Sequence, residues 1–266
     1  MEAAAIAAKS PLKILREPSV YLVGRQSLDG AAIERFLGEH GVTWQTDTEV
    51  GGEALAEMAG RVCYMSYGKG RRTNREFLGH IVDVGHGSVL EHAVWSFLIT
   101  GVSRSFTHEL IRHRHFSYSQ LSQRYVDESE SPFIEPDPIA DDPALHAIFC
   151  AAVNAARGAY DELVAGLERK FSDVPDRTLR RKLARQAARS VLPNATETKI
   201  FVTGNARALR HFIELRGSEH ADVEIRKAAV QMLKLMQAES PGMFSDYELV
   251  PLPDGTHATH TVHPKV

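Results

Sequence analysis

Cysteine is scarce in this sequence, which has only Cys63 and Cys150 among its 266 residues. Two thiols so far apart in the chain cannot supply a disulfide framework or a four-ligand zinc site. Both fall on expected helices among apolar neighbours, and neither has the sequence context of an activated thiol. We therefore expect two buried, inert thiols in a protein of a reducing, intracellular compartment.

Long apolar runs and an excess of basic charge are also missing. No apolar stretch approaches the roughly 20 residues that a membrane-spanning helix needs. The alanine-rich start, residues 1–11, lacks the basic region of a signal peptide. The chain has 31 basic and 34 acidic residues, whereas a protein that binds nucleic acid by charge carries a broad positive field. These absences argue against membrane or nucleic-acid partners and favour a cytoplasmic protein.

Segments of helical and strand-like character alternate along the chain. Residues 21–23, 93–102 and 197–204 are typical of strands, and 93–102 is so apolar that we expect it to be buried on both faces. Helices are expected at 52–64, 103–113, 143–171, 175–192, 205–216 and 219–239, with a polar loop after residue 113. The pattern predicts an α/β fold of the α+β type, in which a central sheet is flanked by long helices.

The domain organisation expected from the sequence is simple. No internal repeat or clear linker interrupts the chain, so we predict one mixed domain over residues 20–250. Residues 1–19 are expected to be a flexible N-terminal extension, and 251–266 a loose polar C-terminal tail. No glycine-rich dinucleotide fingerprint follows a strand, so a flavin or nicotinamide would not bind in a Rossmann crevice.

The densest polar cluster runs from Arg112 to Tyr125 and contains three arginines, three serines and two glutamines. A guanidinium group grips phosphate oxygens with two parallel hydrogen bonds, and serine and glutamine side chains can complete such a cage. The composition suits an anionic, planar, hydrogen-bonding ligand such as a nucleotide. A solvated basic turn is the alternative, and the extended Ser/Gln/Arg pattern argues against it.

A second basic group, Arg181, Arg185 and Arg189, lies on one face of the helix expected at 175–192. Like charges at this spacing cost a few tenths of a kcal/mol per pair, so an acidic partner should offset them. That partner is either a protein carboxylate or a ligand phosphate. An RNA-binding face is a weaker alternative, because no aromatic residues are interleaved with the arginines.

Two histidine patterns are poor metal sites. His108 and His113 resemble the zinc-peptidase signature, but they lie five residues apart, and Arg112 occupies the position of the second ligand. His257, His260 and His263 fall in the polar tail, where nothing fixes their geometry. We expect no metal. The segment 86–92, His-Gly-Ser-Val-Leu-Glu-His, could by itself be only a helix cap.

Taken together, these segments resemble the flavin-dependent thymidylate synthase family. Arg112-His113-Arg114, followed at the family's spacing by Ser122 and Arg124, is similar to its signature. Further matches run in the family's order from about residue 54 to 247, and the sequence looks most like the actinobacterial branch. They include 86–92, Arg104 before 108–111, 185–189 ending in Leu192-Pro193, 205–207, His211, and Arg216 before 218–220. Ser119 and Gln120 depart from the usual Asn and Glu.

The resemblance assigns roles to individual residues. It implies FAD contacts from Ser88, Arg112, His113, Arg114, Gln120, Asn205, Arg207 and His211. It implies dUMP contacts from Glu109, Arg112, Gln120, Leu121, Ser122, Gln123, Arg124, Arg189 and Arg216. Arg216 would be the catalytic residue that favours ionisation of the uracil ring at N3.

The same resemblance implies the reaction and the assembly. Residues 20–250 would be a catalytic domain with a non-Rossmann flavin site that converts dUMP to dTMP. Methylenetetrahydrofolate would donate the carbon, and FAD reduced by NADPH would donate the hydride, without a covalent enzyme nucleophile. The family implies a homotetramer whose sites are shared between subunits. A flavin-free nucleotide-binding module and an RNA-binding regulatory protein are the alternatives, and the absorbance spectrum of the purified protein distinguishes them.

Overall fold

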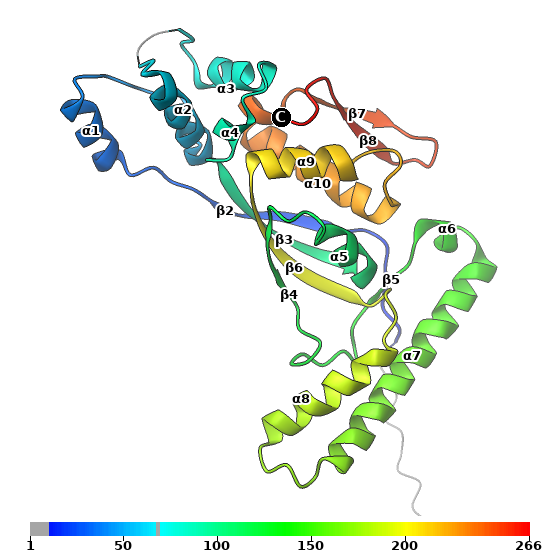
Figure 1. Cartoon of the computed structure of the whole chain (residues 1–266). Coiled ribbons are helices and arrows are strands. Elements are labelled where there is room, and N and C mark those ends of the chain that lie inside the picture. Colours follow the sequence, from blue (N-terminus) through cyan, green and yellow to red (C-terminus); the bar gives the residue numbers. More distant parts are fainter. Residues whose placement is uncertain (1–10, 68–69) are drawn as a thin grey trace, which may run out of the picture. The chain divides into compact units, whose positions relative to one another are not determined.

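A four-stranded sheet is the main β element of the computed structural model, which describes residues 11–67 and 70–266 (Figure 1). Its strands, in spatial order, are β2 (Ser19–Arg25), β3 (Val94–Ser103), β6 (Glu197–Asn205) and β4 (Ser117–Gln120). The strands expected at 21–23, 93–102 and 197–204 are therefore confirmed, as is the mixed α/β class. β4 contradicts the expected polar loop. Its residues are polar and at most half-buried, so this short edge strand carries no apolar periodicity.

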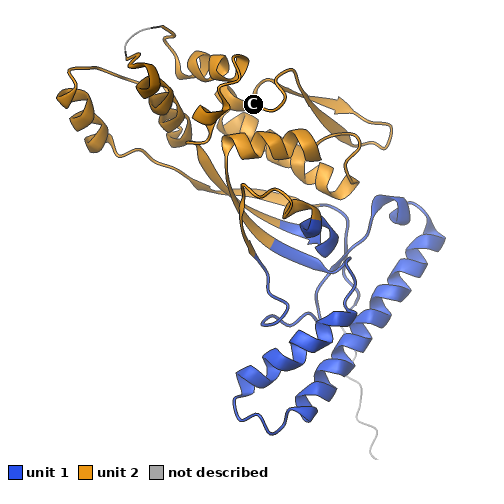
Figure 2. Cartoon of the chain, viewed as in Figure 1, with its two compact units in different colours: residues 1–17, 100–108, 120–199 blue, residues 18–99, 109–119, 200–266 orange. Residues whose placement is uncertain are grey.

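The chain divides into two compact units, shown in Figure 2. Unit 1 contains residues 1–17, 100–108 and 120–199, and unit 2 contains 18–99, 109–119 and 200–266. The boundary passes within β3, β4, β6 and the helix α5 (Arg104–Leu110), which follows β3 directly. Each unit is described by itself below.

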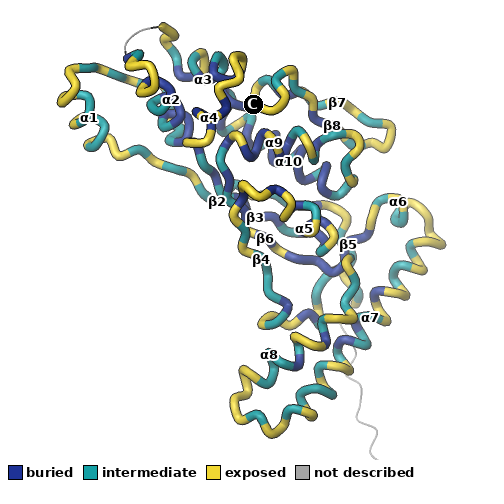
Figure 3. Tube along the Cα trace, in the orientation of Figure 1, coloured by how far each residue is buried: buried dark blue, intermediate teal, exposed yellow. Residues whose placement is uncertain are grey.

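Unit 2 holds most of the buried apolar side chains. Its helices are α1 (Gly30–Glu39), α2 (Gly51–Tyr64), α3 (Asn74–Asp83), α4 (Gly87–Leu90), α9 (Ala206–Arg216), α10 (Val223–Glu239) and α11 (Pro241–Phe244). Figure 3 shows buried residues concentrated along α9 and α10, whereas α1 buries none. Phe212 of α9 and Met232 of α10 are fully buried, as the helical periodicity of 205–216 and 219–239 predicts.

β3 is less buried than expected. Trp95, Phe97 and Ile99 are at most 1 % exposed, but the residues between them, such as Ser96 and Leu98, are only half-buried. The strand therefore shows the alternation of a sheet with one covered face, and the prediction of burial on both faces is wrong for its first half. Apolar composition alone does not reveal how much of each face the rest of the chain covers.

The C-terminus is folded, which corrects the prediction of a loose tail. β7 (Tyr247–Pro251) and β8 (His257–Thr261) pair as an antiparallel hairpin. Buried Arg210 of α9 binds both carboxylate oxygens of Asp246, at 2.7 and 2.8 Å, and its guanidinium lies 4.8 Å from the centre of the Tyr247 ring. This charge-assisted pair fastens the hairpin to α9. Such tertiary anchoring leaves no periodic signal in the polar sequence after residue 250.

Unit 1 contains a long helical hairpin. α7 (Pro143–Lys170) and α8 (Arg177–Ala188) pack together, and a 3-10 turn (Arg189–Val191) continues α8. The other elements are α6 (Asp137–Ala140) and the parallel pair β1 (Ile14–Leu15) and β5 (Phe133–Ile134). Residues 1–10 of the expected N-terminal extension lie outside the described residues. The rest is not free, because β1 is held by β5. No helix in the described ranges is long and apolar enough to cross a membrane.

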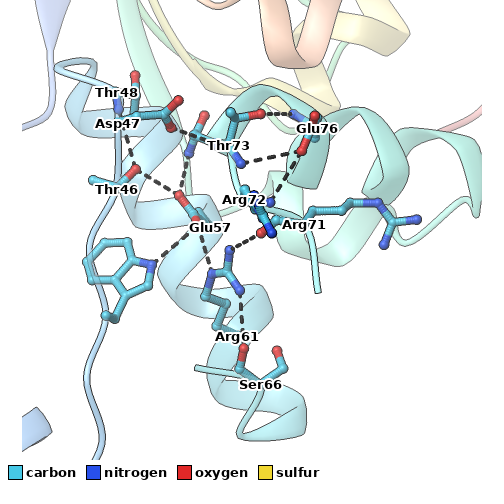
Figure 4. Close-up of polar contacts among 12 residues, drawn as sticks. Thr46, Asp47, Thr48, Glu57, Arg61, Ser66, Arg71, Arg72, Thr73 and Glu76 are labelled. Atoms are coloured by element: carbon cyan, nitrogen blue, oxygen red, sulfur yellow. Dashed lines mark hydrogen bonds and ion pairs between the residues drawn. The ribbon is translucent and has the colours of Figure 1, made fainter. Parts of the chain in front are cut away.

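A buried carboxylate organises the N-terminal half of unit 2 (Figure 4). Glu57 of α2, 1 % exposed, accepts hydrogen bonds from Thr46 at 2.8 Å, Arg61 at 2.7 Å and Asn74 at 2.9 Å. A buried charge is tolerated only when it is paired and hydrogen-bonded, and this network meets both conditions. Glu57 therefore joins the loop before α2 and the start of α3 to α2 itself.

Candidate functional site

The turn after α5 carries the Arg112–Arg114 segment of unit 2. The helix expected at 103–113 ends at Leu110, three residues early. The Tyr118 hydroxyl lies 2.6 Å from the Leu110 carbonyl oxygen and 2.8 Å from that of His113, which satisfies acceptors left free at the helix end. Burial raises the pKa of Tyr118 to about 12, so the phenol stays a donor. The hydroxyl therefore fixes the turn from which Arg112 and Arg114 project.

Arg216, the last residue of α9, is held by two residues of this turn region. Its Nη1 donates to the Glu109 carboxylate at 2.6 Å, its Nη2 to the Glu109 carbonyl at 3.2 Å, and its Nε to His113 Nε2 at 3.1 Å. A guanidinium has five N–H donors, so among the described residues two remain for a further acceptor. Arg216 is thus both fixed in orientation and able to bind a planar, acceptor-bearing group.

The end of α9 is also closed by the C-terminal hairpin. A Cβ on Gly217 would lie 2.1 Å from Thr259 Oγ1, so only glycine fits beneath β8 at this point. Thr259 donates from its backbone to the Gly217 carbonyl at 2.8 Å and from its hydroxyl to the Ile213 carbonyl at 2.8 Å. The segment expected to be a loose tail therefore fixes the residue next to Arg216.

His113 is a neutral hydrogen-bond acceptor at physiological pH. It is 7 % exposed, and burial, together with the charge of Arg216 and the neighbouring His211, lowers its pKa to about 4. Since Nε2 accepts from Arg216, the proton of the neutral ring lies on Nδ1. The ring stays in this form because protonation would place two cations side by side.

Two cavities of unit 2 gather most of the residues predicted to bind FAD. A cavity of about 210 Å³ is lined by Arg112, His113, Arg114, His115, Ala208 and His211. Another, of about 530 Å³, is lined by Glu91, His115, Asn205, Arg207, Ala208, His211, Lys265 and Val266. Six of the eight predicted FAD contacts are in these linings. The other two are Ser88 and Gln120. Ser88 is exposed and follows Gly87, where an added Cβ would lie 2.9 Å from Arg207 Nε. Gln120 belongs to unit 1.

The charge of these linings suits an anionic cofactor such as FAD. Their side chains include four permanent cations, Arg112, Arg114, Arg207 and Lys265, and one carboxylate, that of Glu91. Arg207 neutralises Glu91 across 2.6 Å, and the Asn205 side chain caps α9 by accepting from Ala208 N at 2.8 Å. The remaining cations fit a pyrophosphate without a glycine-rich loop. Lys265 and Val266 were missed from the sequence because the tail was expected to be loose.

The other predicted dUMP contacts, apart from Glu109, Arg112 and Arg216, belong to unit 1. These are Gln120, Leu121, Ser122, Gln123, Arg124 and Arg189. Leu121 N donates to the Lys199 carbonyl at 2.9 Å, which continues β4, and Gln120 donates to Thr107 at 3.2 Å. Ser122 begins the next turn, where its hydroxyl accepts weakly from Arg124 N at 3.4 Å. Arg124 Nε is buried without a hydrogen-bond partner in the described part of the chain.

Unit 1 also places the charges of Arg104, Glu128 and Arg189 close enough to influence one another. Burial lowers the pKa of Arg104; the Glu128 carboxylate opposes this shift and the charge of Arg189 adds to it. The Glu128 carboxylate therefore offsets the repulsion between Arg104 and Arg189. The sequence placed Arg104 within the family's pattern but gave it no contact with a ligand.

Two cations of α8 contact residues of the segment 125–127. Arg185 donates to the Tyr125 carbonyl at 2.7 Å and to Asp127 at 2.8 Å, so a protein carboxylate offsets its charge. Lys182 lies 4.9 Å from the centre of the Tyr125 ring. A small cavity of about 90 Å³ is lined by Arg124, Tyr125, Thr178, Arg181, Lys182 and Arg185. The expectation of an acidic partner is met for Arg185 by the protein itself.

The two thiols are less buried than the sequence predicts. Cys63 is exposed and Cys150 is half-buried, so the prediction of two buried thiols is wrong. No group of histidines, cysteines or carboxylates among residues 11–67 and 70–266 is placed to hold a metal ion.

A cavity of about 840 Å³ is lined by residues of 34–72 that were not predicted to bind a ligand.

The fold and these linings define a mixed α/β protein with a cationic, non-Rossmann ligand site. Residues 46–242 match the model of the thymidylate synthase complementing protein family. The chain is 58 % identical over 224 residues to a flavin-dependent thymidylate synthase of Mycobacterium avium and 60 % identical over 224 residues to one of Mycolicibacterium gilvum. Each alignment covers 83 % of this chain and 89 % of the relative. The chain therefore belongs to the flavin-dependent thymidylate synthase family.

A solved structure supports the fold. The crystal structure of the UMP/dUMP methylase PolB from Streptomyces cacaoi, bound with 5-Br dUMP, superposes with a TM-score of 0.64 at 21 % sequence identity. The match covers 88 % of this chain and 96 % of that chain. At this identity the likeness concerns the backbone arrangement.

The buried neutral histidine generates a prediction about stability. Between pH 6.5 and pH 4 the unfolded chain binds a proton at His113 that the folded chain does not. The free energy of unfolding should therefore decrease as the pH is lowered through this range. This one group should contribute about 3 kcal/mol to the fall. Denaturant unfolding of the wild type and of His113→Gln across this range should give a steeper pH dependence for the wild type. Parallel curves would contradict a neutral His113.

Proposed function

We propose that this protein is a flavin-dependent thymidylate synthase that methylates dUMP to dTMP. The observation that carries the proposal is the constellation of Arg216, Glu109 and His113 next to the cationic cavities, in a chain that belongs to this family. FAD, when bound, would supply the hydride; methylenetetrahydrofolate would supply the carbon and NADPH would reduce the flavin. The protein would supply binding, orientation and electrostatic stabilisation.

Arg216 is the proposed catalytic residue. A uracil ring that loses the N3 proton carries negative charge on its carbonyl oxygens, and the two free N–H groups of Arg216 would stabilise that charge. Glu109 and His113 hold the guanidinium before the substrate arrives, so little reorganisation is needed at the moment of reaction. The neutral His113 keeps the local positive charge on Arg216, where it would act on the ligand.

The remaining predicted contacts would hold the ligands. In this proposal Arg112, Arg114, Arg207 and His211 bind FAD with Ser88, His113, Gln120 and Asn205. Arg124 and Arg189, with Gln120, Leu121, Ser122 and Gln123, bind dUMP, and the guanidinium groups contact its phosphate. Ser122 serves as a hydrogen-bonding group rather than a nucleophile, since a nucleophilic serine needs a base, and its only described side-chain contact is with Arg124 N.

The first test of the function is the colour of the purified protein. We expect flavin absorbance bands, release of FAD on denaturation, and dTMP formation when dUMP, methylenetetrahydrofolate and NADPH are added together. Omitting any one of the three substrates should abolish dTMP formation. A colourless protein that takes up no added FAD would contradict the proposal and favour a flavin-free nucleotide-binding module.

The second test concerns Arg216. Arg216→Ala should keep FAD and measurable dUMP binding but lose turnover by a hundredfold or more, roughly the cost of removing one preorganised donor to a developing anion. Arg169→Ala, on the exposed end of α7, is the matched control and should turn over at the wild-type rate. If the Arg216 variant turns over normally, the residue serves only to join α9 to the turn after α5.

We also propose a homotetramer whose sites are shared between subunits, as the family resemblance implies. Exposed apolar side chains on the strands of unit 2 support association: Tyr21 is 51 %, Val23 49 % and Phe201 40 % exposed. Sedimentation should give a tetramer. Inactive Arg112→Ala and Arg189→Ala chains, mixed and reassembled, should recover part of the activity. A monomer with full activity would refute the proposal.

A further inference from the structure

The two ligand cavities of unit 2 share part of their lining. His115, Ala208 and His211 line both the cavity of about 210 Å³ and the cavity of about 530 Å³. Both cavities therefore open onto the same part of α9 and onto the turn after α5, and they lie next to each other. The smaller one falls below the roughly 300–1,000 Å³ of a site that buries a whole small-molecule ligand. The shared lining indicates two parts of one elongated site, whose junction is formed by these three residues.

Ala208 leaves room at the junction. It is the third residue of α9, and its methyl group is the smallest side chain in either lining. Its backbone N–H donates to the Asn205 side chain at 2.8 Å, which fixes the start of the helix. A ligand can therefore extend from one cavity into the other past a methyl group, whereas a longer side chain at this position would fill the passage.

His115 supplies a polar group at the junction. Its side chain is exposed and makes no hydrogen bond, ion pair or ring contact with the residues that the structure describes. A neutral imidazole has one N–H donor, and an imidazolium has two. Because Arg112 and Arg114 line one cavity and Arg207 lines the other, the acceptor that best suits this position is a phosphate oxygen.

We propose that one FAD molecule spans both cavities and that its diphosphate lies at the junction, where His115 binds it. Ala208 and His115 thereby select a dinucleotide over riboflavin, which would fill only one part of the site. The inference rests on the proposed function, because that function assigns FAD to this site. It adds two residues, Ala208 and His115, to those that the sequence predicts to bind the cofactor.

The contacts of His113 give the site a direction. His113 lines the smaller cavity and accepts from Arg216 Nε at 3.1 Å, and its ring centre lies 5.6 Å from that of His211. The reacting ring of the cofactor has to lie near the catalytic residue, so the smaller cavity takes the flavin ring. The larger cavity, lined by Asn205 and Arg207, takes the adenosine end.

The first test compares FAD with riboflavin, which has the flavin ring but no diphosphate. The full-length protein, freed of flavin, is titrated with each ligand, and binding is followed by the change in flavin fluorescence. His115→Ala should weaken FAD binding about tenfold, the order of one hydrogen bond to a charged group, and leave riboflavin binding within about twofold of the wild type. The holoenzyme of this variant should release FAD about tenfold faster. His257→Ala, at an exposed position of β8 outside both linings, is the control and should bind FAD like the wild type.

A second variant, Ala208→Leu, tests the passage between the cavities. Leucine is close to alanine in helix propensity, so α9 should form, but the longer side chain fills the junction. FAD binding should weaken by about tenfold or more, and riboflavin binding much less. Ala238→Leu, at an exposed position of α10, is the matched control and should bind both ligands like the wild type.

The outcomes separate this inference from the function on which it rests. A wild-type protein that binds no FAD contradicts both. If the wild type binds FAD while His115→Ala and Ala208→Leu keep the wild-type affinity, the function stands and the spanning site is overturned. Equal affinity of the wild type for FAD and riboflavin also overturns it, because the second cavity would then contribute nothing to binding.

Discussion

The guanidinium of Arg216 connects two elements that the rest of unit 2 is built to position. It lies at the end of α9 and binds both the carboxylate and the carbonyl of Glu109, at the end of α5. A pair of this kind is sensitive to small displacements, because its hydrogen bonds need both distance and direction. The hydroxyl of Tyr118 fixes one side of the pair, and the packing of Thr259 on Gly217 fixes the other. The surroundings therefore determine where the two free N–H groups point.

The electrostatics of the unit 2 cavities follow from an excess of cationic side chains. Their linings include four permanent cations and a single acidic side chain, which pairs with Arg207. Such an arrangement is unfavourable in the free protein and becomes favourable when anions bind, so part of the binding energy is the relief of repulsion. In the proposed function, side chains would hold the phosphates where many nucleotide-binding folds use backbone N–H groups and a helix N-terminus.

Periodic segments of the sequence were predicted well, and features that depend on tertiary contacts were not. The apolar stripe of Ile225, Met232 and Met236 predicts the helix α10, and the apolar run at 93–102 predicts the strand β3. The polar strand β4 and the C-terminal hairpin carry no such pattern, because backbone pairing and the Arg210–Asp246 contact hold them.

The candidate site shows the same division. The chemistry and spacing of residues 112–124 predicted ligand-binding groups, and the structure places Arg112, His113 and Arg114 in a cavity lining. The contacts that orient Arg216 were not predicted, since Glu109 and His113 meet it across more than 100 positions of sequence.

The path of the chain between the two units has a consequence for how this architecture can change. The backbone passes from one unit to the other five times, and three of these passages occur between residues 99 and 120. Neither unit is a continuous stretch of sequence, so neither can be excised, fused to another protein or exchanged by recombination as a module. Any division of the chain that separates the two units cuts through β3, α5, β4 and β6. Evolution of such a protein has to proceed by substitution and by changes at loop tips, with both units inherited together.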